Sequence, residues 1–258
     1  REGVFIRGDP PAPRHFKLEI YSRPSHTGPS KLSDREMPMD YAATKAKFDL
    51  PEGVTYLDGN SLGPMVKTAP ARMARAMQEW QDLLIRGWNK AGWMAQPAQL
   101  GDRIARLIGA APGTVVLGDT LSIKVYQALA SALEMNPKRR VILSDTGNFP
   151  SDLYMAEGLC KTLGGQYRLK TVAPEEVMSA IDETVAVTLI TEVDYRTGRR
   201  HDMAEITRRA HEMGALTAWE LAHSAGRLPV ALAGTKADFA VGCTYKYLNS
   251  GPGGPAFI

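Results

Sequence analysis

The sequence predicts an α/β protein in which a mostly parallel sheet carries helices on both faces. Short apolar runs such as "RVILSD" and "VAVTLITEV" alternate with stretches of helical period along the chain. Strands that alternate with helices of about ten to fifteen residues are typical of crossover connections between parallel strands. Polar residues also follow nearly every strand-like run, at the sheet edge where such folds bind ligands.

The individual elements follow from local periodicity. Apolar residues recur at three- and four-residue spacing in the first two helical stretches, and short runs rich in Val, Ile and Leu indicate strands. We expect helices at about 68–86, 97–110, 121–135, 151–164, 174–182 and 202–215. We expect strands at 114–119, 140–145, 166–172, 185–193, 216–221 and 238–244, and the final "PAFI" reads as an interrupted strand.

Composition limits the class of partner. The chain has 258 residues, 44% of them hydrophobic and 23% charged, which is typical of a globular protein with a substantial core. A formal net charge of +3 is too balanced to favour a nucleic acid or an anionic membrane surface, so a small-molecule ligand is expected. The relaxed apolar run "VAVTLI" is far shorter than the roughly 20 residues that cross a bilayer. The first residues lack the apolar core of a secretory signal, and we predict a cytoplasmic protein.

Cysteine and histidine spacing does not favour a metal site. Cys160 and Cys243 lie far apart without a CxxC partner, so neither a disulfide framework nor a zinc cluster is expected. The five histidines show no HxH or HExxH spacing.

Lys246 is the residue that most calls for a chemical explanation. It lies between two tyrosines, directly after a strand-like run and before the turn "NSGPGG". Burial disfavours the ammonium form of a lysine and makes the amine nucleophilic. The alternative is a lysine whose long side chain reaches from the strand end to solvent.

Other strand ends carry residues that could act with this lysine. Glu220 and His223 follow the strand that should lie close to it, and a carboxylate near a reactive lysine is what a pyridoxal phosphate site requires. An acid and a histidine at a strand end can equally form a local hydrogen-bond network. Ser122 stands where a helix begins, and free N–H groups there can bind a phosphate, although it could simply be an N-cap.

The stretch "NFPSD" supplies two further candidates. Phe149 could stack on an aromatic ring, and Asp152 could bind a polar group. Ser151 and Asp152 could instead cap the next helix. Four strand ends that point to one ligand are together more specific than any one of them.

Four stretches resemble the kynureninase family: "YLDGNSLGP" (56–64), "NFPSD" (148–152), "AHSAG" (222–226) and "YKYLNSGPGGPAF" (245–257). The resemblance runs from about residue 39 to the end of the chain. It implies a pyridoxal-phosphate-dependent enzyme of the aspartate-aminotransferase-like fold, also called fold type I. It also implies a homodimer that hydrolyses L-kynurenine, or its 3-hydroxy form, to anthranilate (or 3-hydroxyanthranilate) and L-alanine in tryptophan catabolism.

The same resemblance suggests roles for individual residues. Lys246 would bond covalently to pyridoxal 5'-phosphate, and Tyr245 would reach the phosphate and take part in proton transfer. The remaining matching positions fall into two sets. Those that would bind the cofactor are Leu121, Ser122, Phe149, Asp152, Thr191, Glu220 and His223. Those that would border the substrate are Asn60 and Ser61.

Two departures from the family pattern stand out. The family carries aspartate where this chain has Glu220, and one extra methylene moves a carboxylate by roughly 1.5 Å. Misplacement of about 1 Å can cost on the order of 100-fold in rate. Family members also continue past the lysine region, so we expect the C-terminal small domain and the substrate-binding arginine to lie beyond Ile258.

The expected organisation follows from this resemblance. Residues 1–38 read as an extended or disordered arm, extraneous if Met37 or Met39 is the biological start. Residues 39–110 read as an N-terminal helical segment. Residues 111–258 read as an incomplete large domain that binds the cofactor.

Two other interpretations stay open. The chain could be a related pyridoxal-phosphate enzyme such as a cysteine desulfurase or an aminotransferase, although neither cysteine lies in a Gly-rich loop as a desulfurase requires. It could also be a catalytically silent remnant of the fold that serves as a binding or dimer-forming module, an interpretation that Glu220 favours.

Overall fold

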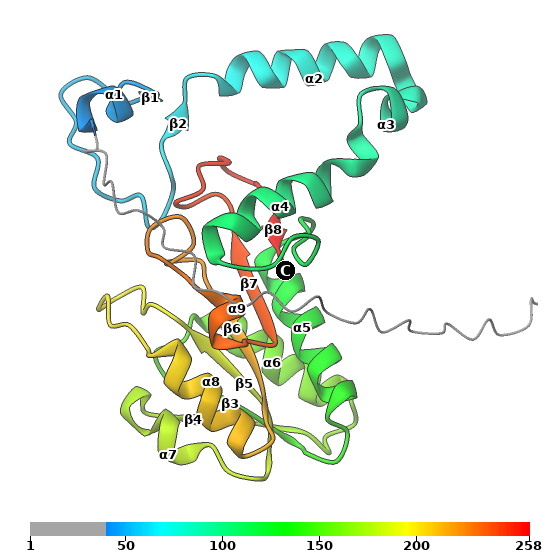
Figure 1. Ribbon diagram of the computed structural model, residues 1–258, viewed down its shortest axis with the longest axis vertical. Helices are drawn as coiled ribbons and strands as arrows, with labels where there is room; N and C mark the ends of the chain where they lie inside the picture. Colours follow the sequence, from blue (N-terminus) through cyan, green and yellow to red (C-terminus); the bar gives the residue numbers. More distant parts are fainter. Residues whose placement is uncertain (1–39) are drawn as a thin grey trace, which may run out of the picture. The chain divides into compact units, whose positions relative to one another are not determined.

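The described part of the chain, residues 40–258 of a computed structural model, is built on a six-stranded sheet (Figure 1). The strand order is β4-β3-β5-β6-β7-β8, and only the pair β7 and β8 is antiparallel. The strands are β3 (Val141–Asp145), β4 (Arg168–Val172), β5 (Val185–Thr191), β6 (Leu216–Glu220), β7 (Phe239–Cys243) and β8 (Ala256–Phe257). The expected arm at 1–38 lies outside the described residues.

Helices precede or follow most of these strands. The α-helices are α1 (Tyr41–Lys45), α2 (Ala69–Leu83), α3 (Gly87–Lys90), α4 (Gln96–Ile108), α5 (Leu121–Met135), α6 (Pro150–Thr162), α7 (Val177–Ala180), α8 (Met203–Glu212) and α9 (Leu232–Thr235). The 3₁₀ turns are η1 (Leu84–Arg86), η2 (Trp93–Ala95) and η3 (Pro174–Glu176). A two-residue pair, β1 (Phe48–Asp49) with β2 (Met65–Val66), completes the described elements.

Two hydrophobic cores cover the two faces of the sheet. Side chains of α5 and α6 form one core, and side chains of α4, α7, α8 and α9 contribute to the other. Neighbouring residues of β3 divide between them, because successive side chains of a strand point to opposite faces: Val141 and Leu143 join one core and Ile142 the other. The predicted α/β class, with a mostly parallel sheet and helices on both faces, is confirmed.

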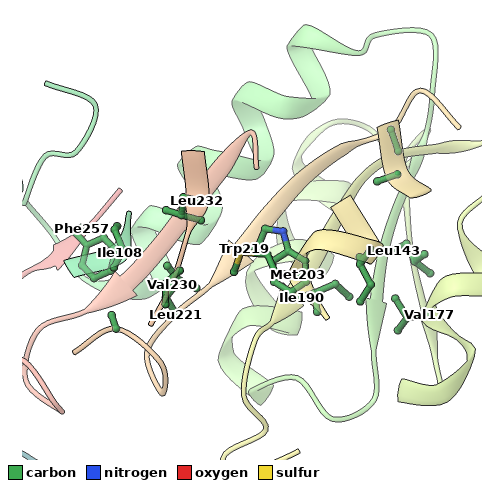
Figure 2. Close-up of a cluster of buried hydrophobic side chains, with 14 of the residues drawn as sticks. Ile108, Leu143, Val177, Ile190, Met203, Trp219, Leu221, Val230, Leu232 and Phe257 are labelled. Carbon is green, nitrogen blue, oxygen red and sulfur yellow. The ribbon is translucent and has the colours of Figure 1, made fainter. Parts of the chain in front are cut away.

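The core on the α8 side is anchored by aromatic residues (Figure 2). Trp219 of β6 and Phe257 of β8 are fully buried in it, and the Trp219 indole N–H donates to Thr207 of α8 over 3.1 Å. A buried indole needs such a partner, because an unpaired N–H would lose its hydrogen bond to water. This contact fixes β6, the strand that ends at Glu220, against its covering helix.

One expected strand is wrong. Residues 114–119 form only an isolated bridge, between Leu117 and Phe257. The segment runs extended beside β8, where Val116 exchanges backbone hydrogen bonds with Ile258, but β8 offers only two strand residues. Asp119 then has a positive φ of 55°, which turns the chain into α5 and ends any strand. The helix expected at 174–182 is shorter, since it consists of the 3₁₀ turn η3 and the four-residue helix α7, and the one expected at 68–86 ends in the 3₁₀ turn η1. The other expected helices and strands are present, with small shifts at their ends.

The segment before residue 111 consists mainly of helices. None of the side chains of α2 is buried, whereas α4 buries Ile104, Ala105 and Ile108 in the same core as α8. Among the described residues, no helix is both long enough and apolar enough to cross a membrane.

Candidate active site

Four neighbouring parallel strands end at one edge of the sheet, and this edge forms the candidate site. The strands β3, β5, β6 and β7 run in the same direction, so the segments that follow them converge. A cavity of about 170 Å³ lies there, beside the first turn of α5. It is lined by Thr120, Leu121, Ser122, Phe149, Ser151, Asp152, Glu220, Ala222, His223, Tyr245 and Lys246.

Lys246 is buried at this cavity rather than extended to solvent. Only 8% of the residue is exposed, which excludes the alternative of a lysine that reaches out to water. Its Nζ lies 2.7 Å from Nε2 of His223 and 5.7 Å from the centre of the Phe149 ring. The amine is therefore held between a hydrogen-bonding ring and an aromatic face, next to the cavity.

His223 is a neutral imidazole under ordinary conditions. Burial and the neighbouring Lys246 ammonium lower the pKa of His223 to about 4. Nε2 can then accept a hydrogen bond from the ammonium group of Lys246, and the proton of the neutral ring belongs on Nδ1. Nδ1 is buried and has no partner among the described residues. One donor of the site is thus left for a ligand.

Two buried carboxyl groups lie on the same cavity. Burial, followed by repulsion from Asp152, raises the pKa of Glu220 to about 8, and burial raises the pKa of Asp152 to about 6. Glu220 Oε1 accepts the backbone N–H of Ala222 over 2.5 Å, while Glu220 Oε2 and Asp152 Oδ2 have no described partner. Glu220 thus lines the cavity even though its side chain is one methylene longer than the aspartate of the kynureninase pattern.

The first turn of α5 presents free backbone N–H groups to the cavity. Thr120 is the N-cap and its hydroxyl accepts from the N–H of Ile123, so the alternative that Ser122 is the cap is wrong. Leu121 and Ser122 follow the cap, and the first N–H groups of a helix have no partner within the helix. Such groups, together with a serine hydroxyl, form an anion-binding arrangement.

Ser151 and Asp152 do not cap α6 either. Phe149 occupies the N-cap position, and the Ser151 hydroxyl donates to Asp152 Oδ1 over 3.3 Å. Tyr245 also lines the cavity. Its phenol has a pKa raised to about 12, mainly because it is partly buried. At neutral pH its hydroxyl keeps its proton and can donate a hydrogen bond.

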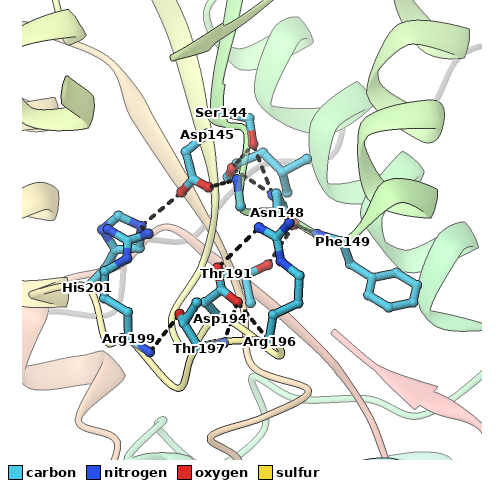
Figure 3. A network of polar contacts seen from close by, with 12 residues as sticks. Ser144, Asp145, Asn148, Phe149, Thr191, Asp194, Arg196, Thr197, Arg199 and His201 are labelled. Carbon is cyan, nitrogen blue, oxygen red and sulfur yellow. Dashed lines mark hydrogen bonds and ion pairs between the residues drawn. The ribbon is translucent and has the colours of Figure 1, made fainter. Parts of the chain in front are cut away.

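A buried network of polar side chains holds the backbone of Phe149 in place (Figure 3). Asn148 donates to the Ser144 hydroxyl and to the carbonyl of Leu189, and its own carbonyl oxygen accepts from the Phe149 N–H over 2.7 Å. The Thr191 hydroxyl donates to the same oxygen over 2.7 Å. Because all of these groups are paired, the loop after β3 is held in one arrangement against β5.

The sequence-predicted residues divide into two groups. Leu121, Ser122, Phe149, Asp152, Glu220, His223, Tyr245 and Lys246 all line the cavity. Thr191, Asn60 and Ser61 are not among its lining residues. Thr191 is buried in the Asn148 network, and the Ser61 hydroxyl donates to Asp58 over 2.8 Å.

The loop that carries Asn60 and Ser61 nevertheless contacts the lysine segment. The N–H of Gly63 donates to the carbonyl of Tyr245 over 2.8 Å, and the Asn249 amide donates to the carbonyl of Pro64 over 3.1 Å. A side chain at residue 63 would meet the carbonyl oxygen of Lys246 at 2.1 Å, so only glycine permits this approach.

Sequence reasoning missed Asn148 and Tyr195. Asn148 belongs to the stretch "NFPSD", in which Phe149 and Asp152 are the predicted site residues. The side-chain amide of Asn148 acts through hydrogen bonds to residues about forty positions away, which the local sequence does not reveal. Tyr195 packs edge-on against Phe149 and stacks on His223. The polar stretch "DYRTG" after β5 was the available signal for Tyr195, because it lies at the same sheet edge.

Comparison with known proteins places this geometry in a family. The model of the class-V aminotransferases matches residues 55–256, most of the chain. The chain belongs to the aminotransferase class-V family. It is 51% identical over 231 residues to a kynureninase of Burkholderia pseudomallei and 52% identical over 223 residues to a kynureninase of Pseudomonas fluorescens. The resemblance to kynureninase that the motifs indicated is thereby confirmed.

These matches cover 87% and 84% of this chain but only 55% and 54% of the two relatives. The chain thus spans about half the length of the curated relatives it matches. Among solved structures, it resembles the cysteine desulfurase of Thermococcus onnurineus NA1, with a TM-score of 0.67 and 21% identity over 84% of this chain and 56% of that chain. A cysteine desulfurase of Escherichia coli gives a TM-score of 0.63 at 17% identity, again over 84% of this chain and 56% of the other. At these identities the two structures support the class-V aminotransferase fold alone.

Proposed function

We propose that this chain is the cofactor-binding part of a kynureninase, an enzyme that hydrolyses L-kynurenine or its 3-hydroxy form to the corresponding anthranilate and L-alanine. The observation that carries the proposal is Lys246, buried against His223 on a cavity with a free helix N-terminus and two carboxyl groups, each with one oxygen that has no described partner. The identity of about half to curated kynureninases gives the substrate class.

The residues present fit pyridoxal 5'-phosphate. The N–H groups of Leu121 and Ser122 would bind its phosphate, together with the Tyr245 hydroxyl. Glu220 Oε2 and His223 Nδ1 are buried polar atoms without a described partner, and buried polar atoms are normally paired, so a polar ligand is expected beside them. When bound, the cofactor supplies an electron-accepting ring that stabilises negative charge on the substrate.

The chain's own residues then have separable roles. Lys246 would hold the cofactor covalently and, when released, move a proton at the substrate α-carbon. His223 would accept a hydrogen bond from the lysine ammonium at Nε2 and donate from Nδ1. The ring of Phe149 would cover the cofactor ring, while Asp152 and Thr191 would hydrogen-bond its polar groups. The segment with Asn60 and Ser61 would border the substrate.

We also propose that the protein acts as a homodimer. The support is the face of α2 that carries Met73, Met77 and Trp80, each about two-thirds exposed. These positions lie four and three residues apart, so they share one side of the helix. The cytoplasmic location stays a prediction from the sequence.

The cysteine desulfurase interpretation finds no support in the two cysteines. Cys160 is buried in α6 and Cys243 is buried at the end of β7, and burial raises the pKa of both thiols. A desulfurase needs a reactive thiolate, which such sites disfavour.

The test is covalent capture followed by turnover. The purified chain is mixed with pyridoxal 5'-phosphate, reduced with borohydride, and searched by mass spectrometry for a label on Lys246. We expect a label in wild type and none in Lys246→Met. L-kynurenine is then added to the unreduced protein, and anthranilate fluorescence reports hydrolysis. Capture without anthranilate would leave a cofactor-binding module of the family; absence of capture would contradict the enzyme proposal itself.

A further inference from the structure

Tyr195, which is 37% exposed, contacts two residues of the candidate site at once. Its ring meets the Phe149 ring edge-on, with centroids 5.1 Å apart and planes at 66°. It also stacks on the His223 ring, at 6.2 Å and 27°. Both arrangements are among those that aromatic pairs prefer. Tyr195 itself does not line the cavity.

The two rings that Tyr195 contacts are the ones beside the Lys246 amine. The Lys246 Nζ lies 2.7 Å from Nε2 of His223 and 5.7 Å from the centre of the Phe149 ring. Phe149, Tyr195, His223 and Lys246 therefore form a closed ring of contacts. A shift of the Tyr195 ring would release two of the groups that locate the amine.

His223 depends on this contact more than Phe149 does. The backbone of Phe149 is fixed through Asn148, but the only described hydrogen bond of the His223 ring is the one to Lys246. Its Nδ1 is buried without a described partner. A histidine held by one nitrogen can still turn about the bond to that partner, so its plane has to be set by packing. The stacked Tyr195 ring supplies that packing.

Hydrogen bonds to Asp194 close the turn that carries Tyr195, and Figure 3 shows Asp194 with Arg196 and Thr197. Asp194, which is buried, accepts the backbone N–H groups of Arg196 and Thr197 at 2.7 and 3.1 Å through Oδ1. The N–H of Gly198 donates to the carbonyl of Asp194 over 2.9 Å, and Gly198 has a positive φ of 70°, which favours glycine. The Arg196 guanidinium lies over the Tyr195 ring, 5.4 Å from its centre.

We propose that Tyr195 is a positioning residue of this site: its ring holds His223 and Phe149 in the arrangement that locates the Lys246 amine. The role belongs to the ring and not to the hydroxyl, for which the described residues provide no hydrogen-bond partner. The inference deepens the proposed function, since it concerns the same lysine, but one of its two tests needs neither cofactor nor substrate.

The first test follows the titration of the His223 imidazole by NMR in the chain without cofactor, with His223→Gln to identify the signal. Wild type and Tyr195→Phe should titrate alike, near pH 4. In Tyr195→Leu the imidazole of His223 is less covered. The pKa of His223 should then rise by about one unit toward the ordinary value of 6.5, a tenfold change in proton affinity. Tyr154→Leu, which removes an exposed tyrosine from α6, is the matched control and should change nothing.

The second test measures covalent capture of pyridoxal 5'-phosphate at Lys246 after borohydride reduction. Tyr195→Leu should capture it about tenfold more slowly, because small misplacements of a reacting group lower its rate strongly. Tyr195→Phe and Tyr154→Leu should match wild type. Circular dichroism checks folding, and Tyr195→Met is a second ring-free variant if the leucine variant is unstable.

Where wild type captures the cofactor, a change in neither measurement, or in only one, would overturn the proposal. A Tyr195→Phe variant that behaves like Tyr195→Leu would overturn it too, because the hydroxyl would then carry the effect. If wild type captures no cofactor, the proposed function fails while the His223 titration still decides the role of Tyr195.

Discussion

At the scale of single residues, Glu220 is an acidic side chain whose burial in the candidate site is unfavourable without a ligand. One of its oxygens accepts the Ala222 N–H, the other has no described partner, and the side chain is fully buried near Asp152. Burial of the charged form is costly and Asp152 repels it, and these effects outweigh the attraction of Lys246, so the group keeps its proton to unusually high pH. A ligand that donates a hydrogen bond or carries positive charge beside Oε2 would remove that cost.

This burial predicts a pH dependence of stability without cofactor. The pKa of Glu220 is raised from 4.5 to about 8 in the folded chain, so between these values the folded state holds a proton that the unfolded state has lost. The contribution of Glu220 to stability is therefore highest at the low end of this window and falls as pH rises through about 8. His223, whose pKa is lowered to about 4, contributes a rise in stability between about 4 and 6.5. Glu220→Gln should lessen the fall in melting temperature between pH 5 and 9, with roughly 2–4 °C for each kcal/mol recovered.

Thermal unfolding across this pH range makes the measurement. Asp152, whose pKa is raised to about 6, contributes a fall of the same sign at lower pH, so the variant should flatten mainly the upper part of the curve. An unchanged slope above pH 6 in Glu220→Gln would show that Glu220 does not hold the proton.

At the scale of elements, two residues at the start of α5 have different roles: Thr120 stabilises the helix, and Ser122 is available to bind a ligand. Thr120 caps the helix through its hydroxyl, whereas the Ser122 hydroxyl has no described hydrogen bond and faces the cavity. Loss of a threonine cap typically costs about 1 kcal/mol. A half-buried serine in the first helical turn without a hydrogen bond contributes much less.

We therefore expect Thr120→Ala to lower the free energy of unfolding by about 1 kcal/mol. Ser122→Ala should leave stability nearly unchanged but weaken binding of pyridoxal 5'-phosphate severalfold, because one donor to the phosphate is lost. Urea unfolding and absorbance titration measure the two effects. Equal losses of stability in both variants would contradict the assignment of the cap.

The contact between the 56–64 loop and the lysine segment gives a second prediction at this scale. A Cβ at Gly63 would lie 2.1 Å from the carbonyl oxygen of Lys246 and 2.4 Å from Nδ2 of Asn249. Gly63→Ala should therefore destabilise the chain by about 1–3 kcal/mol, as overpacking usually does.

Gly158→Ala is the matched control. Gly158 lies within α6 and a Cβ there meets nothing within 4 Å, so alanine should stabilise the helix by about 0.8–1 kcal/mol. Chemical denaturation compares the two variants. A Gly63→Ala chain as stable as wild type would mean that this loop does not pack on the lysine segment in solution.

At the scale of the whole molecule, the exposed face of α2 is an apolar surface that the described residues leave uncovered. Met73, Met77 and Trp80 form an apolar row on a helix with no buried residue. Contiguous exposed apolar surface is a mark of interaction sites. We assign this surface to a second copy of the chain.

Trp80→Glu should shift the protein toward the monomer, since a charge in an apolar interface loses its hydration. Sedimentation velocity over a range of concentrations measures the change, and we expect at least a tenfold weaker association, which corresponds to about 1.4 kcal/mol. Tyr154→Glu, at an exposed tyrosine of α6, is the control. A wild-type protein that is monomeric at all concentrations would contradict the dimer proposal.

Much of the element pattern could be predicted because it depends on local sequence. The helix at 121–135 and the strands that end before Thr146, Glu192 and Leu221 follow from period and composition alone. The strand expected at 114–119 could not be judged locally, since its length depends on β8, whose two residues come from the far end of the chain.

The sequence by itself determined the α/β class, the polar strand ends and the motif resemblance that made Lys246 the central residue. Only the tertiary structure decided that Lys246 meets His223, that Thr191 is paired with Asn148, and that Tyr195 contacts both Phe149 and His223. The physical reason is that periodicity reports which face of an element is buried, whereas a hydrogen bond or a ring contact between distant segments depends on strand order and register.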